Sequence, residues 1–211
     1  MSKSDSPSRV PQPVLTQTVT TGDFIRLLAG HVRQDWTPDA PGLLVIGPPG
    51  AGKSAGARQA AETLSGELGE PVGLKDIRLT EITPIDIIGL PNVDKKTGRT
   101  RWAPSELIPG ADDPARGIVV FDELPNAAPA VQTAVYKACT EHMVGPHKLP
   151  LGWWPVLMGN RMSDRGNVFP IPKPLVNRVT VLEVMPQLLN DRGEPGDWLQ
   201  YSLTIPTRRV A

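Results

Sequence analysis

The chain has 211 residues, with 22 basic and 22 acidic side chains, and 39% of its residues are hydrophobic. This composition fits one folded domain, or one domain with part of a second, and argues against a largely disordered chain. The formal net charge of zero disfavours a nucleic-acid partner, because proteins that track DNA by its phosphates usually carry a basic excess.

Cysteine content and hydropathy indicate a cytoplasmic protein. Cys139 is the single cysteine, so no disulfide can form within the chain, which fits a reducing compartment. The first 20 residues lack the apolar segment of a signal peptide, and nowhere do 18 apolar residues run together. We therefore expect no membrane partner.

The N-terminal half is predicted to alternate helix and strand. Residues 1–20 are polar and rich in proline and predict a flexible N-terminal arm. Helical periodicity predicts a helix over residues 23–32, and a short apolar run predicts a buried parallel strand over residues 43–46. The Ala-rich residues 53–64 predict a second helix, and residues 72–79 a second strand.

The alternation continues in the second half of the chain. Residues 90–102 predict a hairpin, and the apolar residues 117–121 a third strand. A helix follows over residues 130–141, and residues 151–158 and 179–184 supply two further strands. Alternating strands and helices predict an α/β sandwich with a mainly parallel sheet.

A motif between the predicted strand at residues 43–46 and the helix that follows it predicts a nucleotide site. It matches the phosphate-binding P-loop and consists of Gly47, Pro48, Pro49, Gly50, Ala51, Gly52, Lys53 and Ser54. Glycine has no Cβ, so backbone N–H groups can surround phosphates, and the next helix directs its positive end at the same anion. We expect Lys53 to contact the β- and γ-phosphates of ATP and Ser54 to bind Mg²⁺. The alternative is a glycine-rich turn without nucleotide.

Two acids follow the apolar strand at residues 117–121. Carboxylates there lie at the carboxyl edge of the sheet, where such folds bind ligands. We expect Asp122 to hold Mg²⁺, through water, and Glu123 to act as the general base for the water that attacks the γ-phosphate. The pair favours ATP hydrolysis over GTPase or kinase chemistry. The alternative is a solvated strand end.

These motifs, together with Gly159-Asn160 and Leu175-Val176-Asn177-Arg178, resemble AAA+ ATPases, particularly the MoxR and dynein-related group. The resemblance runs from about residue 43 to residue 184. It implies a P-loop NTPase fold, a three-layer sandwich that spans residues 21–185 as the AAA+ core. It also implies a homo-oligomeric ring, a hexamer in the family, that remodels a protein partner. Pro125-Asn126 departs from the family pattern after the acid pair.

The resemblance implies two more catalytic residues. Asn160 stands where the family has the polar sensor that orients the attacking water; the alternative is an Asn that caps a turn. Arg178 stands where the family has the arginine finger, which reaches the γ-phosphate in a neighbouring subunit. A guanidinium suits that role because it is always protonated and donates in a rigid fork. Arg161 and Arg165 are rival candidates, and a plain surface charge is the alternative for Arg178.

The chain departs most from the family after residue 184, since only 27 residues follow. Several lid helices need more chain than that. We therefore expect the helical lid to be absent or vestigial, with residues 186–211 as its remnant or a tail. Arg208 matches the lid's sensor arginine only loosely. The alternatives to an ATPase are a nucleotide-gated binding or assembly module with little turnover and a small-molecule phosphotransferase.

The densest basic cluster lies in the predicted hairpin. It consists of Lys95, Lys96, Arg99 and Arg101. Related ATPases often place pore-facing insertions at this point of the chain. The cluster is either a solvated hairpin or a surface that contacts substrate or nucleic acid.

Overall fold

The computed structural model describes residues 16–40, 42–161, 169, 171, 178–190, 192–196 and 199–200. Six parallel strands form the central sheet, in the order β1-β10-β2-β9-β6-β3. Their bounds are β1 (Thr16–Thr20), β2 (Gly42–Ile46), β3 (Val72–Arg78), β6 (Arg116–Asp122), β9 (Trp153–Gly159) and β10 (Val179–Met185).

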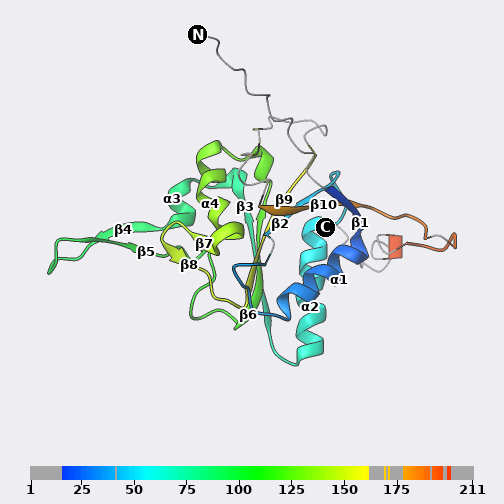
Figure 1. Ribbon diagram of the computed structural model, residues 1–211, viewed down its shortest axis with the longest axis horizontal. Coiled ribbons are helices and arrows are strands. Elements are labelled where there is room, and N and C mark those ends of the chain that lie inside the picture. The colour runs from blue at the N-terminus through cyan, green and yellow to red at the C-terminus, as the bar shows by residue number, and fades with distance from the viewer. Residues whose placement is uncertain are drawn as a thin grey trace, which may run out of the picture.

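Helices cover both faces of the sheet. Figure 1 shows α1 (Thr21–Val32) and α2 (Lys53–Leu68) on one side, and α3 (Pro84–Ile88) and α4 (Pro129–Glu141) on the other. Successive strand residues point to opposite faces, so Leu43 and Val45 pack with α1 and α2, whereas Leu44 packs with α4. The three-layer α/β sandwich expected from the sequence is therefore confirmed.

Local sequence explains where the helices next to the P-loop begin and end. The side chain of Thr20 caps α1 by accepting a hydrogen bond of 3.0 Å from the N–H of Asp23. The buried face of α2 consists mainly of small residues, among them Ala57, Ala60 and Ala61, which let the helix lie close to the sheet. Gly69 ends α2 with φ 68°, a left-handed conformation that glycine adopts without steric cost.

Two antiparallel hairpins lie outside the sheet. One pairs β4 (Leu90–Val93) with β5 (Thr100–Ala103), as residues 90–102 predicted, and the other pairs β7 (Met143–Val144) with β8 (His147–Lys148). Short 3₁₀ turns occupy Leu79–Glu81 and Leu124–Asn126. Among the residues described, no helix combines the length and apolar character needed to cross a membrane.

The structure corrects the sequence analysis at two elements. Residues 16–20, assigned to the flexible arm, form β1 and pair with β10; residues 1–15 lie outside the described residues. The strand was missed because an edge strand can be polar, and its residues are Thr, Gln, Thr, Val and Thr. The helix α3 was missed because its five residues are too few to show a periodicity.

Candidate active site

The P-loop connects the end of β2 to the start of α2, at the carboxyl edge of the sheet (Figure 1). Gly50 and Gly52 have φ values of 77° and 82°, in the left-handed region where a side chain would be strained. A Cβ on Gly47 would lie 2.4 Å from the carbonyl oxygen of Val184 on β10. Glycine is therefore required at position 47 for close packing, and at positions 50 and 52 for the turn.

Lys53 lies at the centre of the loop. The residue is 8% exposed, and its ammonium donates hydrogen bonds to the carbonyl oxygens of Gly47 at 2.9 Å and Pro48 at 3.1 Å. It also donates to the Oδ1 of Asn160 at 3.1 Å, although the two residues are 107 positions apart. The structure thus brings the P-loop lysine and the expected sensor residue into direct contact.

Ser54 and Asp122 form the oxygen pair expected for Mg²⁺. The hydroxyl of Ser54 donates to the Oδ2 of Asp122 at 2.7 Å. Mg²⁺ prefers such hard oxygen ligands and is usually completed by water and substrate phosphates. Among the described residues, no group of three or more His, Cys, Asp or Glu side chains is arranged to hold a metal ion by itself. The pair therefore fits a metal that arrives with a nucleotide.

Glu123 adopts an unusual backbone conformation beside Asp122. Its φ is 60°, uncommon for a residue other than glycine and often found at functional sites. Its N–H donates to the Oδ1 of Asp122 at 2.7 Å, and its carboxylate accepts a hydrogen bond from the hydroxyl of Thr80. Sequence reasoning missed Thr80, which follows β3, the neighbour of β6 in the sheet. The one sequence feature that could have pointed to Thr80 is its hydroxyl, which comes just after a strand that ends at the same edge of the sheet.

Negative charge gathers at this edge of the sheet. Loss of solvent around its carboxyl raises the pKa of Asp76 on β3, and the charge of Asp122 adds to that effect. Arg58 and Arg78 act in the opposite direction. Of these effects, the charge of Asp122 is the one that a cation bound beside it would offset.

Arg178 does not reach the site of its own chain. It is exposed and immediately precedes β10, whose first residue, Val179, pairs with Gly42 at the start of β2. The P-loop instead follows Ile46, which pairs with Glu183. At about 3.3 Å per residue, Arg178 lies about 16 Å along the strand from that edge.

Of the two rival candidates for the arginine finger, Arg161 and Arg165, the structure describes only Arg161. Arg161 directly follows Asn160 and forms an ion pair of 2.5 Å with Glu183 on β10. That bond holds its guanidinium beside the carboxyl edge. Arg165 and the motif residues Leu175, Val176 and Asn177 lie outside the described residues, as does Arg208.

Nine of the twelve expected site residues line one hollow of about 300 Å³, whereas Gly47, Pro48 and Arg178 do not. It is lined by Pro49, Gly50, Ala51, Gly52, Lys53, Ser54, Ala55, Asp122, Glu123 and Asn160. Backbone donors, one cation, one amide and two acids therefore converge on the same space. This is the set that phosphate binding and water activation require.

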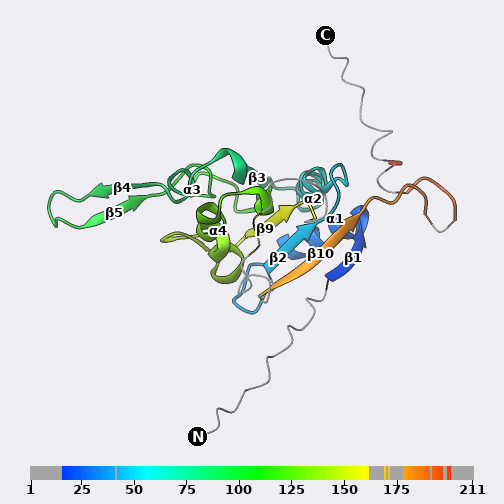
Figure 2. The ribbon, with the colours of Figure 1, turned by 90° about the horizontal axis from the view of Figure 1, so that it is seen from above.

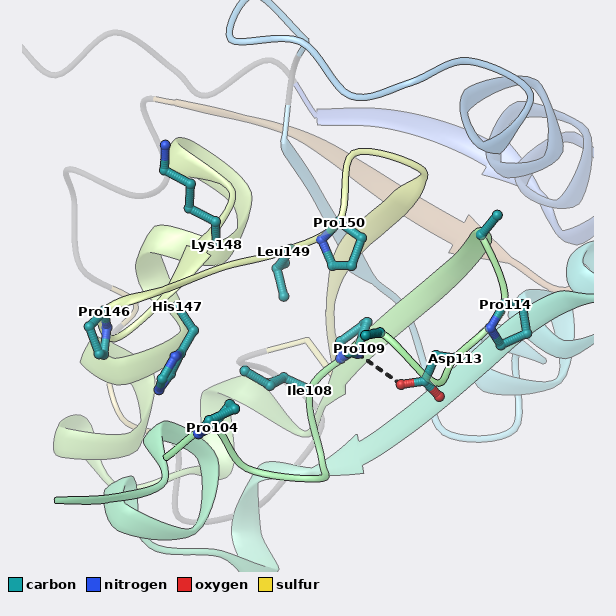
Figure 3. A pocket seen from close by; sticks show the side chains of 13 residues that line it. Pro104, Ile108, Pro109, Asp113, Pro114, Pro146, His147, Lys148, Leu149 and Pro150 are labelled. Carbon is teal, nitrogen blue, oxygen red and sulfur yellow. Dashed lines mark hydrogen bonds between the residues drawn. The ribbon is translucent and has the colours of Figure 1, made fainter. Parts of the chain in front are cut away.

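A larger pocket, of about 620 Å³, lies between the loop after β5 and the hairpin β7–β8 (Figure 3). Proline dominates its wall, at positions 104, 109, 114, 146 and 150. Asp113 accepts a hydrogen bond from the N–H of Gly110 and forms an ion pair with Lys75. The Nε2 of His147 has no hydrogen-bond partner among the described residues. This pocket has no phosphate-binding loop and no acid pair, so we assign the chemistry to the smaller hollow.

Residues 42–144 match the family model of the AAA domain, dynein-related subfamily, and this segment contains the P-loop, Asp122 and Glu123. A solved structure of a "putative ATPase" from Cytophaga hutchinsonii is similar to the chain with a TM-score of 0.52. The fold is that of an AAA+ P-loop NTPase. That likeness has 19% sequence identity and covers 82% of this chain, which spans about half, 47%, of the other. No curated protein matches the chain.

The AAA+ fold accounts for the placement of the site. In its parallel sheet the ends of β2, β6 and β9 meet at one edge, which brings together Lys53, Asp122 and Asn160. The family model describes an AAA domain over residues 42–144, and the likeness to the solved structure shows the fold alone.

Proposed function

We propose that the chain is a MoxR-like AAA+ ATPase core that binds ATP with Mg²⁺ and hydrolyses it. One observation carries the proposal: a single hollow contains the P-loop, the acid pair and Asn160. The arrangement is assembled from three strands that are distant in the sequence, so it does not follow from a P-loop alone.

Each residue has a role that suits its contacts. Lys53 and the loop N–H groups bind the phosphates of ATP, and Ser54 and Asp122 hold Mg²⁺, which neutralises phosphate charge when bound. Glu123 takes a proton from the attacking water, while Asn160 orients that water. The hydrogen bond from Thr80 leaves the second carboxylate oxygen of Glu123 free to accept this proton.

The exposed position of Arg178 supports action in a neighbouring subunit. A guanidinium about 16 Å along the strand from its own P-loop can stabilise phosphoryl charge only across an interface. We therefore propose a homo-oligomeric ring, a hexamer by family resemblance, that couples hydrolysis to remodelling of a protein partner in the cytoplasm.

One observation favours a second candidate, a nucleotide-gated binding module with little turnover. Thr80 already occupies the carboxylate of Glu123, and Lys53 already occupies the amide oxygen of Asn160. Asn160 must therefore release Lys53 before its amide oxygen can orient water, and Glu123 has one of its two oxygens engaged by Thr80. Slow release would leave a protein that holds ATP and barely hydrolyses it.

Phosphate release by Glu123→Gln decides between these functions. The amide keeps the shape of the side chain but cannot take a proton, so turnover should fall about 10²–10⁴-fold while binding of a fluorescent ATP analogue persists. Chelation of Mg²⁺ should abolish turnover of the parent. Glu81→Gln is the matched control, because Glu81 is exposed and pairs with Arg78 outside the hollow. Equal turnover in Glu123→Gln and the parent would remove Glu123 from the mechanism, and a parent that binds ATP without releasing phosphate would favour the binding module.

A further inference from the structure

The hairpin of β4 and β5, with its connecting turn, forms a ribbon (residues 90–103) that extends away from the rest of the molecule. Figure 2 shows it projecting from the sheet and its helices. Its two strands pair only with each other among the described residues. Both strand edges are therefore free to pair with an added chain, and an isolated two-stranded ribbon gains stability when it packs against a partner.

The ribbon carries a concentrated positive charge. Its four cations and one acid, Asp94, give a formal charge of +3, which leaves −3 for the rest of the chain. Asp94 accepts hydrogen bonds from the N–H groups of Lys96 and Thr97, at 2.8 and 3.2 Å, and pairs with Arg101 at 3.5 Å. The side chains of Lys95, Lys96 and Arg99 form no ion pair within the described part of the chain. These three cations are available to an acidic partner.

Apolar side chains are exposed along the strands and at the root of the ribbon. Of the ten exposed large hydrophobic residues described, four lie here: Ile85, Leu90, Val93 and Trp102. A hollow of about 280 Å³ at the root is lined by Ile85, Leu90, Ala103 and Pro104, among others. Exposed apolar groups gathered in one place mark an interaction surface more often than scattered ones do.

The strand register puts Leu90 and Arg101 on one face of the ribbon and Val93 and Trp102 on the other. Leu90 pairs with Ala103 at the root, and Asn92 pairs with Arg101 further out, so all four side chains point to one side. The face therefore changes from apolar at the root to basic towards the turn. A partner segment that fits it has an apolar residue at one end and acidic residues at the other.

We propose that the ribbon docks an acidic, extended segment of a protein partner. This inference rests on the proposed function, because it names the chemistry of the partner that the ATPase acts on. The free strand edges offer main-chain hydrogen bonds to an extended peptide, and the cations at the turn select acidic side chains.

Charge distribution favours a peptide over nucleic acid. A nucleic acid is longer than the ribbon, so its phosphates would also meet the rest of the chain, which has a formal charge of −3. A short acidic peptide can contact the ribbon alone. Proteins that bind single strands also use several aromatic side chains as stacking platforms, and the ribbon has Trp102 alone.

The test uses fluorescence anisotropy with the whole chain. The probe is a labelled peptide of about ten residues that begins with Leu and alternates Val with Glu. A control peptide has Lys in place of each Glu. The triple variant Lys95→Glu, Lys96→Glu, Arg99→Glu should bind the acidic peptide about tenfold or more weakly. Raising NaCl from about 0.05 to about 0.5 M should weaken binding to the parent. The matched control is Arg26→Glu, Arg33→Glu, Lys137→Glu, which changes the charge equally in α1, at the residue that follows it and in α4.

The outcomes separate this inference from the proposed function. Binding of the acidic peptide by the control but not by the ribbon variant supports the docking surface, provided that both melt like the parent. Equal binding by ribbon variant and parent, no binding by the parent, or tighter binding of a labelled single-stranded DNA overturns it. Phosphate release is measured on the same samples. A parent that binds the peptide but releases no phosphate refutes the ATPase and leaves the docking surface standing.

Discussion

At the residue scale, the charged groups of the active site are held by hydrogen bonds within the protein. An ammonium as buried as that of Lys53 is costly unless oxygens surround it, and three oxygens do so here. Two of these acceptors belong to the P-loop, so the cation and the loop stabilise each other. The carboxylates of Asp122 and Glu123 are likewise bonded, to Ser54 and Thr80. These hydrogen bonds offset the cost of holding charged groups in the site.

We predict that Lys53→Ala abolishes ATP binding, because it removes the charge that meets the β- and γ-phosphates. Titration with a fluorescent ATP analogue measures the loss, and a thermal melt checks folding. Lys53→Met keeps the apolar stem in place and should behave in the same way. Lys137→Ala, on the exposed face of α4, should bind like the parent. Near-normal affinity in folded Lys53→Met would contradict the assignment of the P-loop.

At the element scale, His142 ties the end of α4 to β9 and to the segment after α1. It caps α4 with φ 55°, and its Nε2 lies 2.7 Å from the carbonyl oxygen of Trp153. Its ring stacks on Trp36, with centroids 4.5 Å apart and an angle of 6° between the planes. The side chain is buried, and burial lowers the pKa of His142, while the carbonyl of Trp153 acts in the opposite direction.

We predict that His142 makes the protein less stable in acid. Its pKa is about 6.5 in the unfolded chain and lower in the fold, so below that pH the unfolded state binds more protons. Stability is therefore complete above about pH 6.5 and falls as the pH drops towards the folded pKa, by at most about 1.4 kcal/mol per pH unit from this residue.

Urea unfolding between about pH 7.5 and pH 5 measures this effect. His142→Asn should flatten the pH dependence, since Asn tolerates the left-handed backbone and does not titrate. His147→Asn is the control for the loss of another imidazole. An unchanged slope in His142→Asn would show that His142 is not the group responsible.

At the scale of the whole molecule, the parallel sheet separates two sets of residues. The carboxyl ends of β2, β6 and β9 carry Lys53, Asp122 and Asn160, and the start of β10 carries Arg178 at the opposite edge. No rotation of side chains can join these sets within one chain, because about 16 Å of strand lies between them. Arg178 therefore lies out of reach of the nucleotide hollow of its own chain.

We predict that two inactive variants restore each other's activity. Lys53→Ala and Arg178→Ala should each be inactive alone, because every interface lacks one partner. In a mixed assembly, some interfaces pair an intact P-loop with an intact Arg178 and should release phosphate. An arginine finger contributes about 10³–10⁵-fold in GTPases, so the recovery should stand well above background.

A labelled-subunit experiment must first show that the two variants exchange subunits. If exchange occurs and the mixture stays inactive, Arg178 is not a trans-acting finger, and Arg161 or Arg165 is the next candidate. An Arg178→Ala protein that is active alone would reject the assignment sooner.

Short-range patterns were enough to predict the P-loop, the acid pair and the alternation of strands and helices. Each depends on residues that are neighbours in the chain: glycines at a turn, an apolar run before two acids, a helical repeat. The contacts of Lys53 with Asn160 and of Thr80 with Glu123 join residues 107 and 43 positions apart. They required the strand order β2-β9-β6-β3, which the alternation of strands and helices leaves open. The strand β1 also could not be predicted from the sequence pattern. Its polar residues are stabilised by backbone pairing with β10 rather than by a buried face.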